Sequence, residues 1–181
     1  IILGALSTMF KKPKQRHVAN KKALYQKAYP EFIREPFADE PKLEKRFYEA
    51  VHDYNRNKPS AAVAKLEKLR GSCFNNNGRY GVTVFMALCL DDMQLYDKAA
   101  EQYRAAVAIK PNSSLYSNLA LTLERSGRDS EADAAYEQAI RIDPANAKAW
   151  NNMAQKQMRS GNYEKALELA GKAAQLDPKL A

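Results

Sequence analysis

A pattern of small, aromatic and proline residues recurs along the second half of the chain, at intervals of 33 and then 34 residues. Its members are Ala99, Ala132 and Ala166; Tyr103, Tyr136 and Ala170; Ala106, Ala139 and Ala173; and Pro111, Pro144 and Pro178. A period in this range, kept in step over small residues, is the sequence signature of stacked helical hairpins. We therefore expect an array of repeats whose neighbours bury one another's apolar faces.

Each period contains two stretches of apolar and small residues at helical spacing. In the central period they are Tyr116, Leu119, Ala120 and Leu123, followed by Ala132, Ala135, Tyr136, Ala139 and Ile140. Between the stretches, Gly127 and Gly161 can adopt the left-handed backbone that ends a helix. The closing prolines push the residue before them out of the helical region. The pattern predicts one antiparallel pair of short helices per period.

The paired helices, the turn glycine and the closing proline resemble the tetratricopeptide repeat family. The last repeat carries the family's signature residues at Trp150, Met153, Ala154, Gly161, Tyr163, Ala166, Ala173 and Pro178, and the middle one at Tyr116, Leu119, Ala120, Gly127, Ala132, Tyr136, Ala139 and Pro144. The resemblance implies an all-α fold in which antiparallel helix pairs stack into a right-handed superhelix.

The repeats become less regular toward the N-terminus. Gln94 stands where the turn glycine belongs, so we expect one irregular turn. Farther upstream, a degenerate hairpin is broken at "NKPS", where Pro59 is acceptable in the first turn of the second helix. Terminal repeats are commonly atypical because one face meets water. We expect a repeat domain over residues 42–181, with the degenerate hairpin at 42–72 and repeats at about 80–112, 113–146 and 147–180.

The chain opens with ten uncharged residues, "IILGALSTMF", and has no initiating methionine. Because a membrane-spanning helix needs about twenty apolar residues, this stretch is half a span. We interpret residues 1–12 as part of a longer hydrophobic anchor with its basic flank, and 13–41 as a spacer with a short helix. Basic residues mark the cytoplasmic side of a span, here Lys11, Lys12, Lys14 and Arg16.

This interpretation predicts repeats in the cytoplasm behind an N-terminal membrane anchor. Two alternatives stay open. Ala5, Leu6 and Ser7 have the small-x-small form of a signal-peptidase site, which would make the protein exported. An apolar turn packed on the repeats would instead leave the protein soluble in the cytoplasm.

The net charge of +8 does not indicate a nucleic-acid partner, because of where the charge lies. Residues 1–35 hold eight basic and two acidic side chains, a balance of +6, whereas the remaining residues carry only +2. The repeats are thus nearly neutral, and no basic groove for a phosphate backbone is predicted.

The sequence contains no recognisable catalytic or metal-binding constellation. Cys73 and Cys89 form no CxxC motif, and neither His17 nor His52 has a partner at the spacing of a known signature. We interpret Cys89 as a small buried residue on an apolar helix face. Asp91 and Asp92 are adjacent and point in different directions on a helix, so helix-end solvation is the interpretation that we prefer. We therefore expect neither an enzyme nor a cofactor.

In the tetratricopeptide repeat family, the first helix of each pair lines a concave groove that holds partner peptides. By position, the resemblance implies these groove residues: Val84, Leu88, Asn118, Leu121, Lys148, Asn151, Asn152 and Gln155. Chaperone-binding members clamp a C-terminal carboxylate with lysine, asparagine and arginine. Asn118 and Lys148 match that clamp, but Asn152 replaces the arginine, and Val84 and Leu88 replace the first pair. We therefore do not predict a chaperone clamp.

The predicted function is that of a non-enzymatic protein-interaction scaffold, tethered to a membrane by its N-terminus. Asparagine amides can bind a peptide backbone, which makes Asn118, Asn151 and Asn152 the preferred contact residues. Leu167, Leu169 and Leu176 lie on the last predicted helix, which has no covering helix after it, so homo-oligomers could form there. The alternatives are a soluble adaptor subunit of an enzyme complex and an exported repeat protein of envelope assembly.

Overall fold

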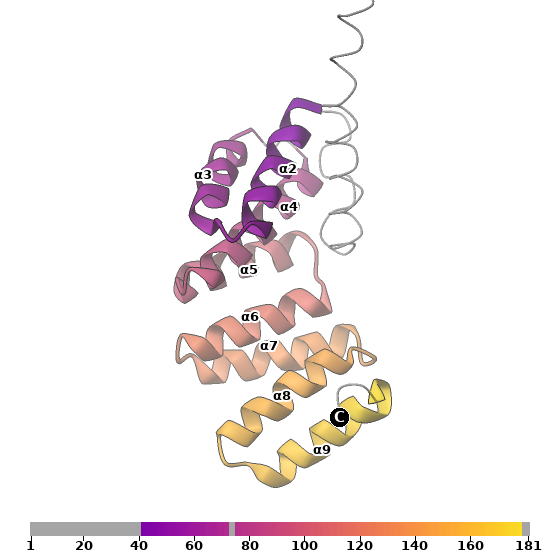
Figure 1. The fold of residues 1–181 in the computed structure, drawn as a ribbon. Helices are drawn as coiled ribbons and strands as arrows, with labels where there is room; N and C mark the ends of the chain where they lie inside the picture. Colours follow the sequence, from indigo (N-terminus) through magenta and orange to yellow (C-terminus); the bar gives the residue numbers. More distant parts are fainter. Residues whose placement is uncertain (1–40, 73–74, 179–181) are drawn as a thin grey trace, which may run out of the picture. The chain divides into compact units, whose positions relative to one another are not determined.

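The computed structural model describes residues 41–72 and 75–178, and within these ranges the chain forms eight α-helices (Figure 1). They are α2 (Pro41–Asn55), α3 (Pro59–Arg70), α4 (Asn76–Asp92), α5 (Tyr96–Ile109), α6 (Ser113–Arg125), α7 (Asp129–Ile142), α8 (Ala147–Arg159) and α9 (Tyr163–Leu176). The helices belong to two compact units, one up to Phe85 and one from Met86 onward, and α4 contributes residues to both.

The first unit is organised around aromatic side chains from α2 and from the middle of α4. The Phe47 and Phe85 rings meet edge to face with centroids 5.5 Å apart, and Tyr54 approaches Phe85 at 6.0 Å. Helix α3 packs against α2 and buries Leu66 and Leu69. Pro59 occupies the first turn of α3, where a missing N–H group costs no hydrogen bond.

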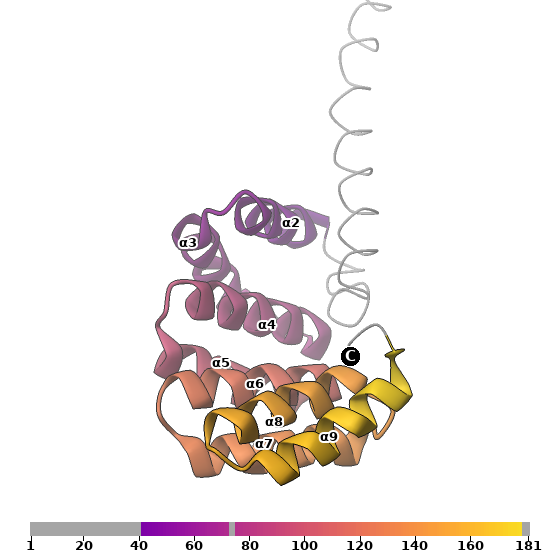
Figure 2. The ribbon, with the colours of Figure 1, turned by 60° about the horizontal axis from the view of Figure 1, so that its bottom comes forward.

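The second unit repeats one packing scheme, in which α6 pairs with α7 and α8 pairs with α9 (Figure 2). Ala99 and Ala132 are fully buried, because a methyl group allows two helix backbones to approach closely. Tyr103 and Tyr136 are also fully buried and fill the wider gaps between helices. The sequence prediction of an all-α fold built from consecutive helix pairs is confirmed.

The turns between paired helices share one backbone conformation even where the residue differs. Gly127 and Gly161 have φ of +77° and +78°, the left-handed region that glycine enters without steric cost. Gln94, at the position of the missing glycine, also has a positive φ of +60°. This turn therefore differs from the others in its amino acid and not in its backbone conformation. The left-handed conformation is less favourable for Gln94 than it would be for glycine.

Two asparagines cap the N-termini of α6 and α8. Their positions after the closing prolines explain why the period changes from 33 to 34 residues. The Asn112 side chain accepts a hydrogen bond from the Leu115 amide at 3.1 Å, and Asn146 accepts one from Ala149 at 3.2 Å. Asn112 directly follows its closing proline, whereas Ala145 separates Asn146 from Pro144. The additional residue lengthens the turn and leaves the cap intact.

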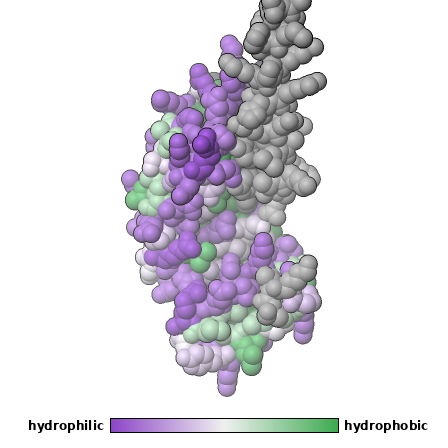
Figure 3. All heavy atoms as spheres, in the orientation of Figure 1, coloured by the Kyte–Doolittle hydropathy of each residue, from purple (hydrophilic) through white to green (hydrophobic). Residues whose placement is uncertain are grey.

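Apolar side chains are exposed along α9 and at the end of α8. The exposed fractions are 76% for Leu167, 71% for Tyr163 and 59% for Met158. Figure 3 shows hydrophobic atoms at the lower end of the molecule, where Figure 1 places α9. Leu169, in contrast, is buried at 5% exposure because it faces α8.

The anchor, basic flank and spacer expected in residues 1–41 lie, apart from Pro41, outside the described residues. Across 41–72 and 75–178, none of the helices combines the length and the apolar character that a membrane crossing demands.

Candidate partner-binding groove

The predicted contact residues of the second unit occupy one face of each first helix. Lys148, Asn151, Asn152 and Gln155 follow each other on α8 at intervals that place them on a single helix face. Asn118 and Leu121 occupy the corresponding positions on α6, and Leu88 lies near the end of α4. Lys148 and Gln155 are exposed, and the other five residues are half-buried.

Val84 differs from the other predicted contact residues. It lies in the first unit, and its side chain is 0% exposed. In this structure Val84 therefore contributes to packing.

The ends of successive first helices are joined by ion pairs. Arg125 on α6 donates to the Asp91 carboxylate on α4 at 2.7 Å, and the Thr122 hydroxyl donates to the other carboxylate oxygen at 2.8 Å. The Asp91 side chain is only 16% exposed. The expectation that Asp91 merely solvates a helix end is therefore wrong, because the carboxylate links two repeats.

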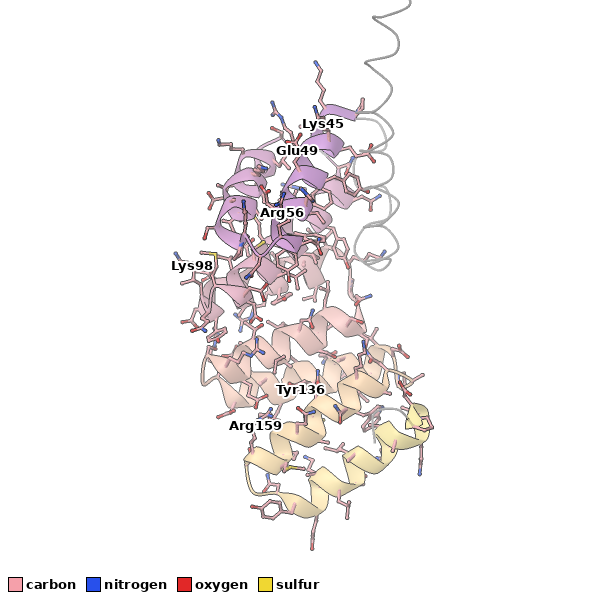
Figure 4. All side chains as sticks on the ribbon, in the orientation of Figure 1. Lys45, Glu49, Arg56, Lys98, Tyr136 and Arg159 are labelled. Carbon is pink, nitrogen blue, oxygen red and sulfur yellow. The ribbon has the colours of Figure 1, made fainter. Side chains whose placement is uncertain are left out.

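The same link recurs one repeat later. Arg159 on α8 donates to Glu124 on α6 through Nε at 2.8 Å and Nη2 at 2.5 Å, and the Tyr136 hydroxyl lies 3.4 Å from the same carboxylate (Figure 4). Burial of the Tyr136 hydroxyl, followed by the negative charge of Glu124, raises the pKa of this tyrosine. Tyr136 therefore stays protonated at neutral pH and can act as a hydrogen-bond donor.

These two ion pairs employ most of the charged groups on the first-helix face and leave its amides without partners. Among the described residues, the side chains of Asn118, Asn151 and Asn152 make no hydrogen bond or ion pair with one another or with other groups. Each amide is half-buried and offers both a donor and an acceptor. This face thus offers three half-buried amides with free hydrogen-bonding groups, beside the exposed side chains of Lys148 and Gln155.

A second row of equivalent positions runs across the same face. Leu88, Leu121 and Gln155 recur at intervals of 33 and 34 residues on α4, α6 and α8. Together with Lys148 at the start of α8, this row changes from apolar to polar and basic along the unit. This face of the first helices therefore offers different chemistry at its two ends.

Lys156 is a buried lysine that the sequence pattern did not predict. The Lys156 side chain on α8 is 5% exposed, and its ammonium group lies 2.7 Å from Asp133 and 3.9 Å from Asp129 on α7. Its place at an apolar position of a first helix could have indicated burial. Because long charged side chains are buried only when paired, that place also indicated a carboxylate partner. It joins α8 to α7 of the preceding repeat.

The unit contains no cluster of reactive groups within the described ranges. No three histidine, cysteine or carboxylate side chains there come together as metal ligands. Burial, followed by the charge of Asp92, raises the pKa of the Cys89 thiol to about 12, so the thiolate nucleophile is not formed at neutral pH. The arrangement is suited to binding through a surface.

Comparison with protein families assigns three segments of this chain to one type of repeat. Three family models described as tetratricopeptide repeat match residues 84–113, 113–146 and 135–168. Together they extend over the second half of α4, all of α5 to α8 and the beginning of α9.

Curated proteins with similar sequences match a part of the chain. A DnaJ homolog subfamily C member 7 homolog of Dictyostelium discoideum is 41% identical over 88 residues, which is 46% of this chain and 16% of that protein. The small glutamine-rich tetratricopeptide repeat-containing protein 2 of Mycosarcoma maydis is 34% identical over 84 residues, or 24% of its length. A peroxisomal targeting signal receptor of Eremothecium gossypii is 35% identical over 74 residues, or 13% of its length. The chain thus matches less than a quarter of each relative.

Solved structures of similar fold cover nearly the whole chain at low sequence identity. A crystal structure of MamA superposes with a TM-score of 0.70 at 18% identity and covers 93% of this chain and 94% of its own. MamA from Desulfovibrio magneticus RS-1, residue 41 to the end, gives a TM-score of 0.69 at 18% identity, with 88% of this chain and 97% of its own covered. At this identity the likeness concerns the fold alone.

Proposed function

Because this chain is a tetratricopeptide repeat protein, and therefore a protein-binding scaffold, we propose that it holds an extended peptide segment of a partner in the first-helix groove. The groove, as we define it, consists of Leu88 on α4, Asn118 and Leu121 on α6, and Lys148, Asn151, Asn152 and Gln155 on α8. One relative is named a targeting signal receptor, and recognition of a signal segment fits this mode of binding.

The observation that supports this proposal is the contrast between the groove's charges and its amides. Asp91, Glu124 and their arginine partners are satisfied within the protein, so they offer little to a ligand. Asn118, Asn151 and Asn152 have unused donors and acceptors at half-buried positions. An extended peptide presents N–H and C=O groups along its length, which is the complement that three amides require.

The row from Leu88 through Leu121 to Gln155 suggests the character of the peptide. An apolar side chain fits the α4 and α6 end, where two leucines are half-buried. A polar or acidic side chain fits the α8 end, where Lys148 is exposed and basic. We propose a peptide whose two ends differ in this manner.

Selection from a random peptide library, followed by calorimetry on the selected peptides, tests this proposal. Replacing Asn118, Asn151 and Asn152 together by alanine removes three hydrogen-bonding side chains, and we expect at least about tenfold weaker binding. The matched control replaces the second-helix amides Gln102 and Gln175 by alanine, which leaves the groove intact. Equal affinity of the triple variant and the control for every selected peptide would refute the groove assignment.

We further propose that the N-terminus tethers the repeats to a membrane. The apolar stretch "IILGALSTMF" followed by Lys11, Lys12, Lys14 and Arg16 supports this, because basic residues beside an apolar segment favour an anionic headgroup region. Sedimentation of the full chain with anionic vesicles, compared with a variant in which the four basic residues are serine, measures the contribution of charge. Recovery of the chain in the supernatant with vesicles of any composition would favour a soluble adaptor, and processing after Ser7 in cells would favour an exported protein.

We also propose that the exposed face of α9 forms contacts between copies of the chain. Tyr163 and Leu167 are one helical turn apart and are the most exposed large apolar residues that the structure describes, with Met158 close to them in sequence. Sedimentation velocity over a range of concentrations tests this. We expect a dimer that Leu167→Glu dissociates, and a monomer at every concentration would exclude it.

A further inference from the structure

The first unit carries an excess of positive charge that the second unit does not share. The described residues up to Phe85 hold nine basic and four acidic side chains, a balance of +5. The described residues from Met86 onward hold eleven basic and thirteen acidic side chains, a balance of −2. All nine basic residues of the first unit precede the three segments that match the repeat family models.

Four of these basic residues share one side of α2. They are Lys42, Lys45 and Arg46 of α2 and Arg56 directly after it. Helical spacing places them opposite the buried Phe47. Figure 4 labels two of them, Lys45 and Arg56, which follow one another along the helix with Glu49 between them. This side of α2 extends for about 20 Å, at 1.5 Å per residue.

The adjoining flank of α3 adds two further basic residues. Asp53 follows Arg46 by seven residues, so it lies on the same side of α2, and its carboxylate pairs with Lys65 of α3. Lys58 and Lys68 are seven and three residues from Lys65, spacings that place them on the flank that meets α2. The four basic residues of α2 together with Lys58 and Lys68 are called the basic face below.

The protein does not neutralise the charge of the basic face. All six side chains are exposed, and within residues 41–72 and 75–178 none of them forms an ion pair. In the second unit, by contrast, the arginines at 104, 125, 128 and 159 are each paired with a carboxylate. The basic face is therefore available to a partner of opposite charge.

We propose that the basic face lies against an anionic lipid membrane. Each lysine or arginine close to an anionic bilayer raises the affinity by about fivefold, so six together provide a substantial attraction. Lipid headgroups can move laterally around Glu49, whereas the phosphates of a nucleic acid stand at fixed spacings. The aromatic residues Phe47 and Tyr48 of α2 are buried, so they cannot stack on unpaired bases.

This contact is additional to the proposed N-terminal tether, and the choice of a lipid surface over another polyanion rests on that tether. An anchor in residues 1–12 would hold α2 near the headgroup layer and raise its effective concentration there. Contact through the basic face then determines which side of the first unit faces the membrane.

Sedimentation of the full chain with vesicles tests the proposal. The vesicles contain phosphatidylcholine and phosphatidylglycerol in equal parts, and vesicles of phosphatidylcholine alone serve as the neutral reference. Replacing Lys45, Arg46 and Arg56 together by glutamine should weaken binding to the anionic vesicles at least about tenfold. Added salt should reduce this difference, because it screens exposed charges.

The matched control removes the same amount of charge from the second unit. Lys98, Arg141 and Lys165 are exposed there, and the chain with glutamine at these three positions should bind the anionic vesicles as the unmodified chain does. Circular dichroism checks that both variants keep their helices. If the first variant does not fold, glutamine at Lys42, Lys58 and Lys68 provides a second test of the basic face.

Both variants are also measured in a chain whose residues Lys11, Lys12, Lys14 and Arg16 are serine. A loss that is specific to the basic face in this background supports the proposal, even if the serine substitutions alone have no effect and the tether fails. Equal affinity of the basic-face variant and its control would overturn the proposal. Tighter binding of the unmodified chain to a single-stranded oligonucleotide than to the anionic vesicles would overturn it in favour of a nucleic-acid contact.

Discussion

The buried lysine of α8 allows a prediction that separates the two members of an ion pair. The Lys156 side chain is 5% exposed, whereas its partners Asp133 and Asp129 are 40% and 70% exposed. Removal of the lysine charge therefore leaves two carboxylates that water can reach. Removal of the Asp133 charge leaves a buried ammonium group with its remaining partner 3.9 Å away.

These two losses have unequal costs. Lys156→Met keeps the apolar stem and removes the desolvation penalty together with the attraction, so the free energy of unfolding should change by less than about 1 kcal/mol. Asp133→Asn keeps the shape but removes the closest compensating charge, which should cost about 2 kcal/mol. The double variant should return to the stability of Lys156→Met, because it contains no buried charge to leave unpaired.

Urea unfolding followed by far-UV circular dichroism measures these differences, and thermal unfolding gives a second reading. For a chain of this length, about 2 kcal/mol corresponds to a fall of about 4–8 °C in Tm. The control is Lys165→Met, which alters an exposed lysine of α9. Equal destabilisation by Lys156→Met and Asp133→Asn would refute the reasoning, since it would show that the pair itself contributes net stability.

Further substitutions test the turn, cap and cysteine assignments. Gly127→Ala should lower the free energy of unfolding by about 1 kcal/mol, and Gly171→Ala should raise it by about 0.5 kcal/mol. Neither added methyl group meets an atom within 4 Å, and only Gly127 has a positive φ. Urea unfolding of both variants measures this, and a change of the same sign in both would contradict it. Asn112→Ala should lower the free energy of unfolding by about 1 kcal/mol through loss of its cap, whereas Asn151→Ala, with no cap to lose, should leave it unchanged. With the other cysteine replaced by serine, Cys89 should react with a thiol reagent at pH 8 only on unfolding, because burial raises its pKa to about 12. The pKa of Cys89 is higher in the folded than in the unfolded state. The stability contributed by the protonated thiol is therefore complete below the unfolded pKa and is lost as the pH rises toward 12. Alkaline unfolding of the Cys89→Ser variant would check this.

The repeat period was sufficient to predict the paired helices because local signals and packing requirements coincide there. Gly127 and Gly161 end their helices in the expected conformation, and Tyr103 and Tyr136 are buried as gap-filling residues. Gln94 shows the limit of residue-based reasoning. Its backbone follows the conformation of the other turns, since the packing of the paired helices outweighs the local preference of one residue.

The partners of the polar side chains on the first helices were harder to predict, because exposure on a helix face does not reveal which groups already have partners. Asp91 and Glu124 lie near the ends of first helices, and an arginine on the next first helix neutralises each of them. Placing the repeats in register would have shown an acid followed by an arginine after 34 and 35 residues. The pairing of Lys156 with Asp133 has no such recurrence, so only the packing of α8 against α7 reveals it.

The acidic residues that pair with the next repeat have no counterpart in the last repeat, and this affects what can bind to the exposed face of α9. Met158 stands at the position of Glu124, and Leu167 stands at the position of Asp133, so both acids are replaced by apolar side chains. The 59% and 76% exposures of these side chains show that nothing in the described chain covers them. A helix with basic residues in the register of Lys156 and Arg159 would bury its charges here without compensation, at a cost of several kcal/mol per ion. A surface that is apolar at both points is the better complement to this face, and for this reason we propose that the Met158 and Leu167 side chains of a second copy cover α9.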